Sequence, residues 1–354
     1  IYATAIGMFC SLGAGVALQS QGAAKGGGDG TVFTVLYVLG FGSAIISTLA
    51  LSRVPEPLMP EAAPKQSLFR LLKAPLRDAN FRNLIRFMAS WQFAVNSATP
   101  FFTVYFVQSL GFGMGWVTAF TVVSQLANIL VLRTWGGISD RFSNKSVLNV
   151  AAPAFIACIA GMVLASQINE RALLGAYLLV LHVFMGMAAA GVSLATGNIA
   201  MKLAPRGSAT AYIAANSLIA SFAAGLAPII GGFSADFYAA RELSFHMLWR
   251  DPSGVSQFLR LEISHWDFYF LISGALGLYA CHRLAQIREE GTIGKREVVE
   301  QLVSEARRTI RGVAPVDGSR LSFPGASLIE QHARLHVQKR AARARARREA
   351  MQGV

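Results

Sequence analysis

The sequence predicts an all-α polytopic membrane protein, and three observations support this fold class. Hydrophobic residues make up 53% of the 354 residues and charged residues only 14%, whereas a soluble domain draws about a quarter of its residues from charged types. Long apolar runs recur along the chain, separated by short charged segments. Lys and Arg gather in every second connection, an asymmetry typical of multi-pass membrane proteins.

About eight runs are long enough to span a bilayer, which takes about 20 mostly apolar residues. They cover roughly residues 1–18, 32–52, 87–109, 116–135, 147–166, 172–200, 209–234 and 267–284. The chain begins at Ile1 inside an apolar run that lacks the pattern of a signal peptide. We therefore expect further residues upstream of Ile1.

The basic connections predict the orientation of the spans. Lys and Arg are enriched in the connections 53–86, 136–146 and 201–208 and in the C-terminal tail, and they are sparse in 19–31, 110–115 and 167–171. The basic connections are expected to be cytoplasmic, because basic loops stay on that side. With an even number of spans both ends are then cytoplasmic, in an integral protein of the plasma (inner) membrane.

The same pattern divides the chain into four parts: two spans in 1–52, a linker in 53–86, a six-helix bundle in 87–284 and a basic cytoplasmic tail in 285–354. The linker begins with four prolines and then becomes amphipathic, which predicts a helix on the membrane surface. The stretch from Arg283 to Val354 holds 15 of the 32 basic side chains and 8 of the 19 acidic ones. Its basic character favours binding to anionic lipid, with a solvated tail as the alternative; no specific nucleic-acid partner is expected.

Polar side chains follow single helical faces in four of the spans, and they alternate with two spans that are nearly apolar. Two polar spans followed by one apolar span, twice over, indicate a three-plus-three repeat around a hydrated cavity. We expect 147–166 and 267–284 to face largely outward. The candidate cavity residues are Gln92, Asn96, Gln125, Asn128, His182 and Asn216. The alternative is that such side chains form hydrogen bonds between packed helices; for His182, a structural role and a proton relay both remain open.

The stretch "WGGISDRFSNKSV" at 135–147 lies between two predicted spans. Its central part, "GGISDRFSNK", resembles the charged signature of the major facilitator superfamily, written G-x-L-A/S-D-R-x-G-R-K. Ser143 and Asn144 depart from that signature. "APRGSATAY" at 204–212 is similar to the Pro-Arg-Gly turn before the eleventh helix of such transporters. The resemblance covers roughly 1–290 and implies helices five to twelve of a twelve-helix transporter.

Within this loop we expect a conformational latch formed by Gly136, Gly137, Asp140, Arg141 and Lys145. The glycines would let two helices approach closely, and the two cations would hold the loop at the anionic inner surface. An acid is favourable at a helix N-terminus. The resemblance implies that the acid contacts the beginning of the fifth helix, here at Ile1 to Thr4.

The resemblance implies a secondary active transporter that moves a small solute by alternating access, with a coupling ion that is commonly a proton. A membrane enzyme is not expected, because His246, His265 and Asp267 do not have the spacing of metal ligands. The three cysteines are isolated from one another, so no metal, cofactor or disulfide framework is predicted. A scaffold acting through the basic tail is the alternative function. Nothing in the sequence indicates an oligomeric state.

Overall fold

The computed structural model describes residues 6–7, 10, 13, 31–54, 68–205, 207–251 and 254–313. Most of the first predicted span at 1–18, the proline-rich part of the linker, Arg206 and the tail beyond Val313 lie outside the described residues. Helix α2 (Thr31–Leu51) corresponds to the predicted span 32–52, and its apolar side chains are exposed.

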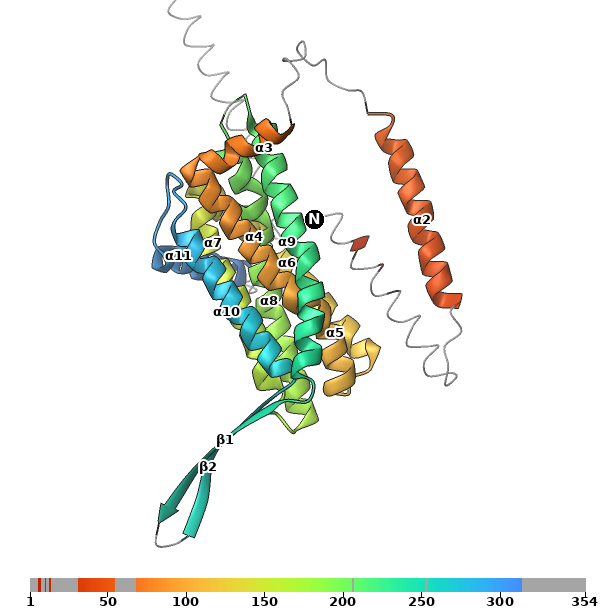
Figure 1. The fold of residues 1–354 in the computed structure, drawn as a ribbon, viewed down its shortest axis with the longest axis vertical. Helices are drawn as coiled ribbons and strands as arrows, with labels where there is room; N and C mark the ends of the chain where they lie inside the picture. Colours follow the sequence, from red (N-terminus) through yellow and green to blue (C-terminus); the bar gives the residue numbers. More distant parts are fainter. Residues whose placement is uncertain are drawn as a thin grey trace, which may run out of the picture. The chain divides into compact units, whose positions relative to one another are not determined.

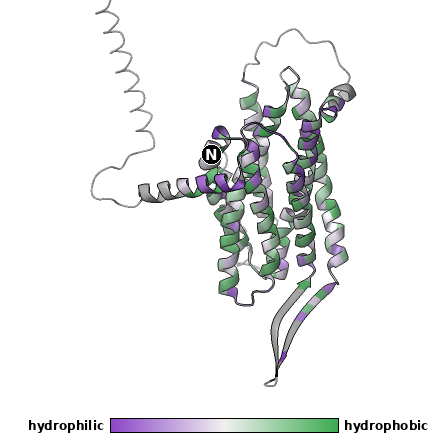
Figure 2. Ribbon diagram, turned by 90° about the vertical axis from the view of Figure 1, so that its left-hand side faces the viewer, coloured by the Kyte–Doolittle hydropathy of each residue, from purple (hydrophilic) through white to green (hydrophobic). Residues whose placement is uncertain are grey.

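The remaining helices follow the predicted order of spans (Figure 1). Their bounds are α3 (Leu68–Arg77), α4 (Ala79–Ala98), η1 (Thr99–Phe101), α5 (Phe102–Val104), η2 (Tyr105–Ser109), α6 (Met114–Arg141), α7 (Asn144–Ala165), α8 (Arg171–Leu203), α9 (Ala209–Tyr238), α10 (Trp266–Ala285) and α11 (Lys295–Val313). By length and composition, α2, α6, α7, α8 and α9 can each cross a membrane. Apolar residues run along the bundle helices, shown in green in Figure 2.

Helices α4 to α10 pack through a chain of neighbours: α6 lies against α8, α8 against α7, α7 against α10, α10 against α4, and α4 against α9. The core between them is rich in aromatic and small side chains, including Phe81, Phe87, Tyr105, Phe120 and Phe270. More than half of the most apolar stretch of α7 is buried. The prediction that 147–166 and 267–284 face largely outward is therefore wrong for the described bundle, because α7 packs on both α8 and α10, and α10 packs on both α4 and α7.

Close helix contacts depend on two glycines of α8. A Cβ atom on Gly186 would collide with the backbone carbonyl oxygen of Ser124 in α6. A Cβ atom on Gly191 would lie 2.9 Å from the Trp135 ring and 2.8 Å from Cβ of Ala151. These positions let α8 lie directly on its neighbours, and Trp135 Nε1 donates to the Met187 carbonyl at 2.9 Å across the contact with α6.

Helix α4 begins before the predicted start of the third span at residue 87. Asp78 caps its N-terminus by accepting hydrogen bonds from the backbone N–H groups of Asn80 and Phe81, at 2.9 and 3.0 Å. Such a cap satisfies donors that the first helical turn leaves free. The polar first turns of α4 were assigned to the linker by composition alone. They belong to the same helix as the apolar run that follows them.

The same span is interrupted near its other end, as expected for a proline inside a helix. Pro100 lies in η1, and the chain continues through α5 into the π-helical turn η2. The hydroxyls of Ser97 and Thr99 donate to the carbonyls of Phe93 and Val95 at 2.8 and 3.0 Å. Side chains thus supplement the backbone hydrogen bonds next to the break.

A β-hairpin joins α9 to α10, and the sequence did not predict it. Strands β1 (Glu242–Asp251) and β2 (Gly254–Ser264) pair antiparallel, with a register irregularity at Met247/Leu248. Alternating apolar and polar residues in "ELSFHM" carried the strand signal. Long apolar runs indicate membrane spans, whereas the signal of this hairpin is a period of two over few residues.

Candidate functional site

Two features of the described bundle could serve a transport cycle: a cavity among α4, α7 and α8, and a cluster of buried polar groups where α6 ends and α7 begins. The cavity has a volume of ≈ 230 Å³. Its lining residues are Met88, Trp91, Gln92, Val95, Phe155, Ala189, Val192, Ser193 and Thr196. Polar side chains of two predicted polar stripes, one on α4 and one on α8, therefore meet at one cavity.

The six predicted cavity residues occupy different positions. Gln92 lines the cavity, whereas the half-buried Asn96 donates to the Gln92 carbonyl at 2.8 Å. Gln125 is exposed on α6, and Asn128 is half-buried there. Asn216 is buried in α9, and its side-chain oxygen has no hydrogen-bond partner among the described residues. A single cavity shared by all six stays a prediction.

His182 lies among aromatic rings. Its ring centroid is 5.1 Å from that of Phe120, in a stacked arrangement, and 5.5 Å from that of Phe106. Its Nδ1 is 2.7 Å from the Leu178 carbonyl oxygen, which makes Nδ1 the protonated nitrogen. The imidazole is buried and does not line the cavity described above.

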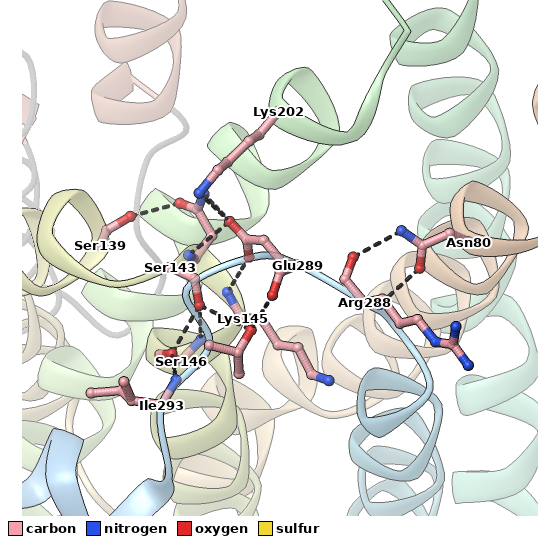
Figure 3. A network of polar contacts seen from close by, with 11 residues as sticks. Asn80, Ser139, Ser143, Lys145, Ser146, Lys202, Arg288, Glu289 and Ile293 are labelled. Atoms are coloured by element: carbon pink, nitrogen blue, oxygen red, sulfur yellow. Dashed lines mark hydrogen bonds and ion pairs between the residues drawn. The ribbon is translucent and has the colours of Figure 1, made fainter.

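The polar cluster, here called the clasp, consists of Ser139, Ser143, Asn144, Ser146, Lys202, Glu289 and Thr292 (Figure 3). At its centre is Glu289, from the segment between α10 and α11, whose side chain is 1% exposed. One carboxylate oxygen accepts from the backbone N–H and the side-chain amide of Asn144, at 3.2 and 3.1 Å. The other accepts from the backbone N–H of Lys145 at 2.7 Å. Glu289 thus supplies a carboxylate to the N-terminus of α7, where the helix dipole favours negative charge.

Lys202, in the last turn of α8, completes the partners of this carboxylate. Its Nζ lies 2.9 Å from Glu289 Oε1. The Lys202 side chain is 47% exposed, so solvent screens this pair and the buried backbone hydrogen bonds contribute more to the stability of the clasp. One acid therefore joins three parts of the chain: the start of α7, the end of α8 and the segment after α10.

Hydroxyl groups extend the clasp around Glu289. Ser143 caps α7 by accepting from the backbone N–H of Ser146 at 3.1 Å. The Ser146 hydroxyl accepts from the backbone N–H of Ile293 at 2.9 Å, and the Thr292 hydroxyl donates to the Glu289 carbonyl at 2.6 Å. Close by, Asn80 exchanges two hydrogen bonds, each 2.8 Å long, with the backbone of Arg288. The segment after α10 is thereby fixed along the ends of α4 and α7.

Of the five predicted latch residues, Lys145 reaches the centre of the clasp through its backbone N–H, and the other four lie beside it. Gly136, Gly137, Asp140 and Arg141 belong to the last turns of α6, not to a loop, because the helix continues to Arg141. No described atom lies within 4 Å of a Cβ built on Gly137, and Gly136 meets Leu194 at an ordinary 3.8 Å. The close helix approach expected at these two glycines is thus not found in the described bundle.

The charged latch residues also differ from expectation. Asp140 is exposed, and its expected partner at Ile1 to Thr4 lies outside the described residues, so its latch role stays a prediction. The Arg141 guanidinium lies over the Phe142 ring at 5.2 Å. Lys145 Nζ donates to the carbonyls of Ala285, at 3.2 Å, and Ile287. Lys145 thus contacts the C-terminal end of α10, where a cation is favourable, rather than only the membrane surface.

Sequence reasoning missed Glu289 because it assigned everything after residue 284 to the tail. Two signals were available in "REEGTIGK" at 288–295: adjacent acids inside a basic segment, and Gly291 between them and the next helix. Gly291 has φ 77°, and a Cβ there would lie 2.7 Å from the Phe142 carbonyl oxygen. The positive φ and the close carbonyl oxygen both require glycine at this position, where the segment turns against the α6–α7 connection.

The sequence profile described as the Major Facilitator Superfamily matches residues 3–228. The chain belongs to the major facilitator superfamily. The predicted all-α fold of this superfamily is confirmed, and the protein is a multi-pass membrane protein. The superfamily match includes the helices that form the cavity and the α6–α7 connection.

Among solved structures, the crystal structure of a D-xylose-proton symporter is similar to this superfamily member at 18% sequence identity, with a TM-score of 0.40. The similarity covers 70% of this chain and 53% of the symporter, so the chain spans about half of the length of that protein. The comparison with curated proteins finds no match.

Proposed function

We propose that the protein is a secondary active transporter that moves a small solute across the plasma (inner) membrane by alternating access. The observation that carries this proposal is the cavity, where polar side chains of α4 and α8 meet inside a superfamily bundle. Intramembrane polar groups are costly unless they face protein or water. A solute site near the membrane midplane explains their placement.

In this proposal the clasp end of the bundle is cytoplasmic and the hairpin end is on the opposite side. The basic connections favour this orientation. The clasp joins parts of one bundle to each other, so it would keep the cytoplasmic end rigid while that bundle rocks as a unit. Asp140, exposed at the same end, would bias the two conformations through a partner at the beginning of the fifth helix.

Transport would be coupled to an ion gradient, and a proton is the candidate. Asp267 is a buried carboxylate near the hairpin end of α10, accepting from the Ser166 hydroxyl at 3.1 Å. It does not line the described cavity. Within the described residues, the acids and His182 therefore lie away from the cavity lining, and we assign the coupling role to none of them.

The test uses the full-length protein in proteoliposomes with a panel of labelled small solutes. We expect at least one solute to be taken up faster than in protein-free vesicles, with uptake reduced when the proton gradient is dissipated. If no solute of the panel crosses the membrane faster than in protein-free vesicles, the proposal is contradicted. Removal of residues 314–354 distinguishes transport from the alternative function, a scaffold that acts through its basic tail. A scaffold would lose its membrane or partner contacts, whereas a transporter would keep its uptake rate.

A further inference from the structure

Aromatic rings form the apolar wall of the cavity. The ring centroids of Trp91 and Phe155 are 5.8 Å apart, and those of Phe87 and Trp91 are 6.3 Å apart. All three side chains are buried, so their rings are held in place by neighbours. A fixed aromatic wall favours a flat ring in the solute, because rings stack face to face or edge to face.

The polar wall offers hydrogen-bond acceptors to a solute. The Thr196 hydroxyl donates to the Val192 carbonyl at 2.7 Å, and the Ser193 hydroxyl donates to the Ala190 carbonyl at 3.2 Å. Both hydroxyl hydrogens are thus directed to the backbone of α8, which leaves oxygen lone pairs for the cavity. The Gln92 amide supplies a further acceptor and can also donate.

The lining also has a defined electrostatic character. Among the described residues that line this cavity there is no Asp, Glu, Lys, Arg or His. A carboxylate or phosphate placed there would meet no cation in this lining, and it would face oxygen lone pairs. An ammonium group is attracted to aromatic rings such as that of Trp91, and a neutral hydroxyl can donate to the free lone pairs.

We propose that this cavity binds a solute with an aromatic ring and a hydrogen-bond-donating group, and that it excludes anionic solutes. The inference names the substrate class of the proposed transporter and therefore rests on that function. The cavity has room for such a solute: an enclosed cavity of about 150 Å³ holds a benzene molecule, and the described part of this open cavity measures ≈ 230 Å³.

Ring-matched probes test the proposal on full-length protein in detergent, with binding measured by saturation-transfer NMR. The probes are benzylamine, benzyl alcohol and benzoate, together with D-xylose as a polyol without an aromatic ring. We expect benzylamine and benzyl alcohol to bind at least tenfold more tightly than benzoate or D-xylose. Binding of benzoate or D-xylose as tight as that of benzylamine would overturn the substrate class.

Two variants place the binding in this cavity. Thr196→Val keeps the side-chain shape but removes the oxygen acceptor, so benzyl alcohol should bind about three- to tenfold more weakly. The matched control is Thr118→Val, a half-buried threonine in α6 that does not line the cavity and whose hydroxyl donates to the Met114 carbonyl, and it should leave binding unchanged. Ser193→Lys adds a cation to the lining and should reverse the preference between benzoate and benzylamine. Unchanged preference in a folded Ser193→Lys protein would overturn the site.

Solute exchange in proteoliposomes separates this inference from the proposed function. If another solute exchanges while none of the aromatic probes binds, the substrate class is wrong and the transport function stands. If benzylamine binds with the expected sensitivity to Thr196→Val but no solute exchanges, the site stands and the transport function is wrong.

Discussion

Glu289 stabilises the clasp because its buried carboxylate is matched by donors on several sides. Two backbone N–H groups, a side-chain amide and an ammonium group surround its two oxygens. Hydrogen bonds to an ionised group are stronger than neutral ones, at about 1.5–3 kcal/mol. The neighbouring Glu290 is exposed and has no such partners among the described residues.

Substitution Glu289→Gln should lower the free energy of unfolding by about 2 kcal/mol. The amide removes the charge from the N-terminus of α7, and its NH₂ group, which replaces one of the two carboxylate oxygens, would face either the donors of Asn144 or the backbone N–H of Lys145. Thermal unfolding of the purified full-length protein measures the loss. Glu290→Gln is the matched control and should leave the unfolding temperature unchanged; equal effects of the two variants would show that the clasp does not contribute.

Gly186 permits the closest contact between α6 and α8. Gly186→Ala should destabilise the bundle by about 1–3 kcal/mol, the usual effect of overpacking, because the new methyl group meets the Ser124 backbone. Gly175→Ala, in the same helix with no atom within 4 Å of its Cβ position, should instead be neutral or stabilise by about 0.5–1 kcal/mol. Thermal unfolding measures the stability of both variants. A larger loss of stability in Gly175→Ala than in Gly186→Ala would contradict this packing.

His265 precedes α10 at the hairpin end, outside the span. Burial lowers the pKa of His265 below its ordinary value of 6.5, against the opposing effect of Asp236. A lowered histidine pKa means that the unfolded chain binds the proton more tightly, so stability is present above about pH 6.5 and falls as the pH drops below it. The unfolding temperature of His265→Gln should therefore fall less than that of the wild type between about pH 7.5 and 5.5. A steeper fall in the variant would contradict the lowered pKa.

At the scale of helices and strands, apolar run length predicted where each bundle helix lies but not where it ends. Asp78 begins α4 within the predicted linker, and Ser143 begins α7 directly after α6, so the expected charged loop is mostly helix. Helix ends depend on local capping hydrogen bonds, which a search by hydropathy does not consider. The hairpin was missed for a related reason, since its signal is a period of two over few residues.

Asp140 belongs to the last turn of α6, where an acid is unfavourable to the helix dipole. Asp140→Asn should therefore leave thermal stability unchanged or slightly higher, unlike Glu289→Gln. If the side chain acts as a latch through a partner at the beginning of the fifth helix, the same variant should still slow transport by the full-length protein. Normal transport at normal expression would contradict the latch, and so would a changed solute affinity in a conformationally locked form.

At the scale of the whole molecule, the sequence could predict polar helix faces but not how each helix is rotated in the bundle. Gln92, Ser193 and Thr196 meet at the cavity, whereas Gln125 and Asn128, on α6, do not line it. Spacing of three or four residues identifies a helical face, and only packing determines what that face contacts. The clasp could not be predicted either, because it joins residues more than 140 positions apart.

The orientation across the membrane can be tested by thiol labelling of full-length protein lacking its native cysteines. Glu290→Cys, beside the clasp, should react with a membrane-impermeant reagent only from the cytoplasmic side. Ser244→Cys, in β1, should react only from the opposite side, because α10 separates the two positions. Labelling of both positions from the same side would contradict the assigned orientation.

Accessibility of the cavity from both sides of the membrane tests alternating access most directly. In full-length protein without native cysteines, Ser193→Cys places one thiol in the cavity lining, and an impermeant reagent is applied to each side separately. We expect modification from both sides, with the two rates changing in opposite directions when Asp140→Asn shifts the conformational equilibrium. A thiol that reacts from neither side, or from one side only at a rate that Asp140→Asn leaves unchanged, would contradict transport through this cavity.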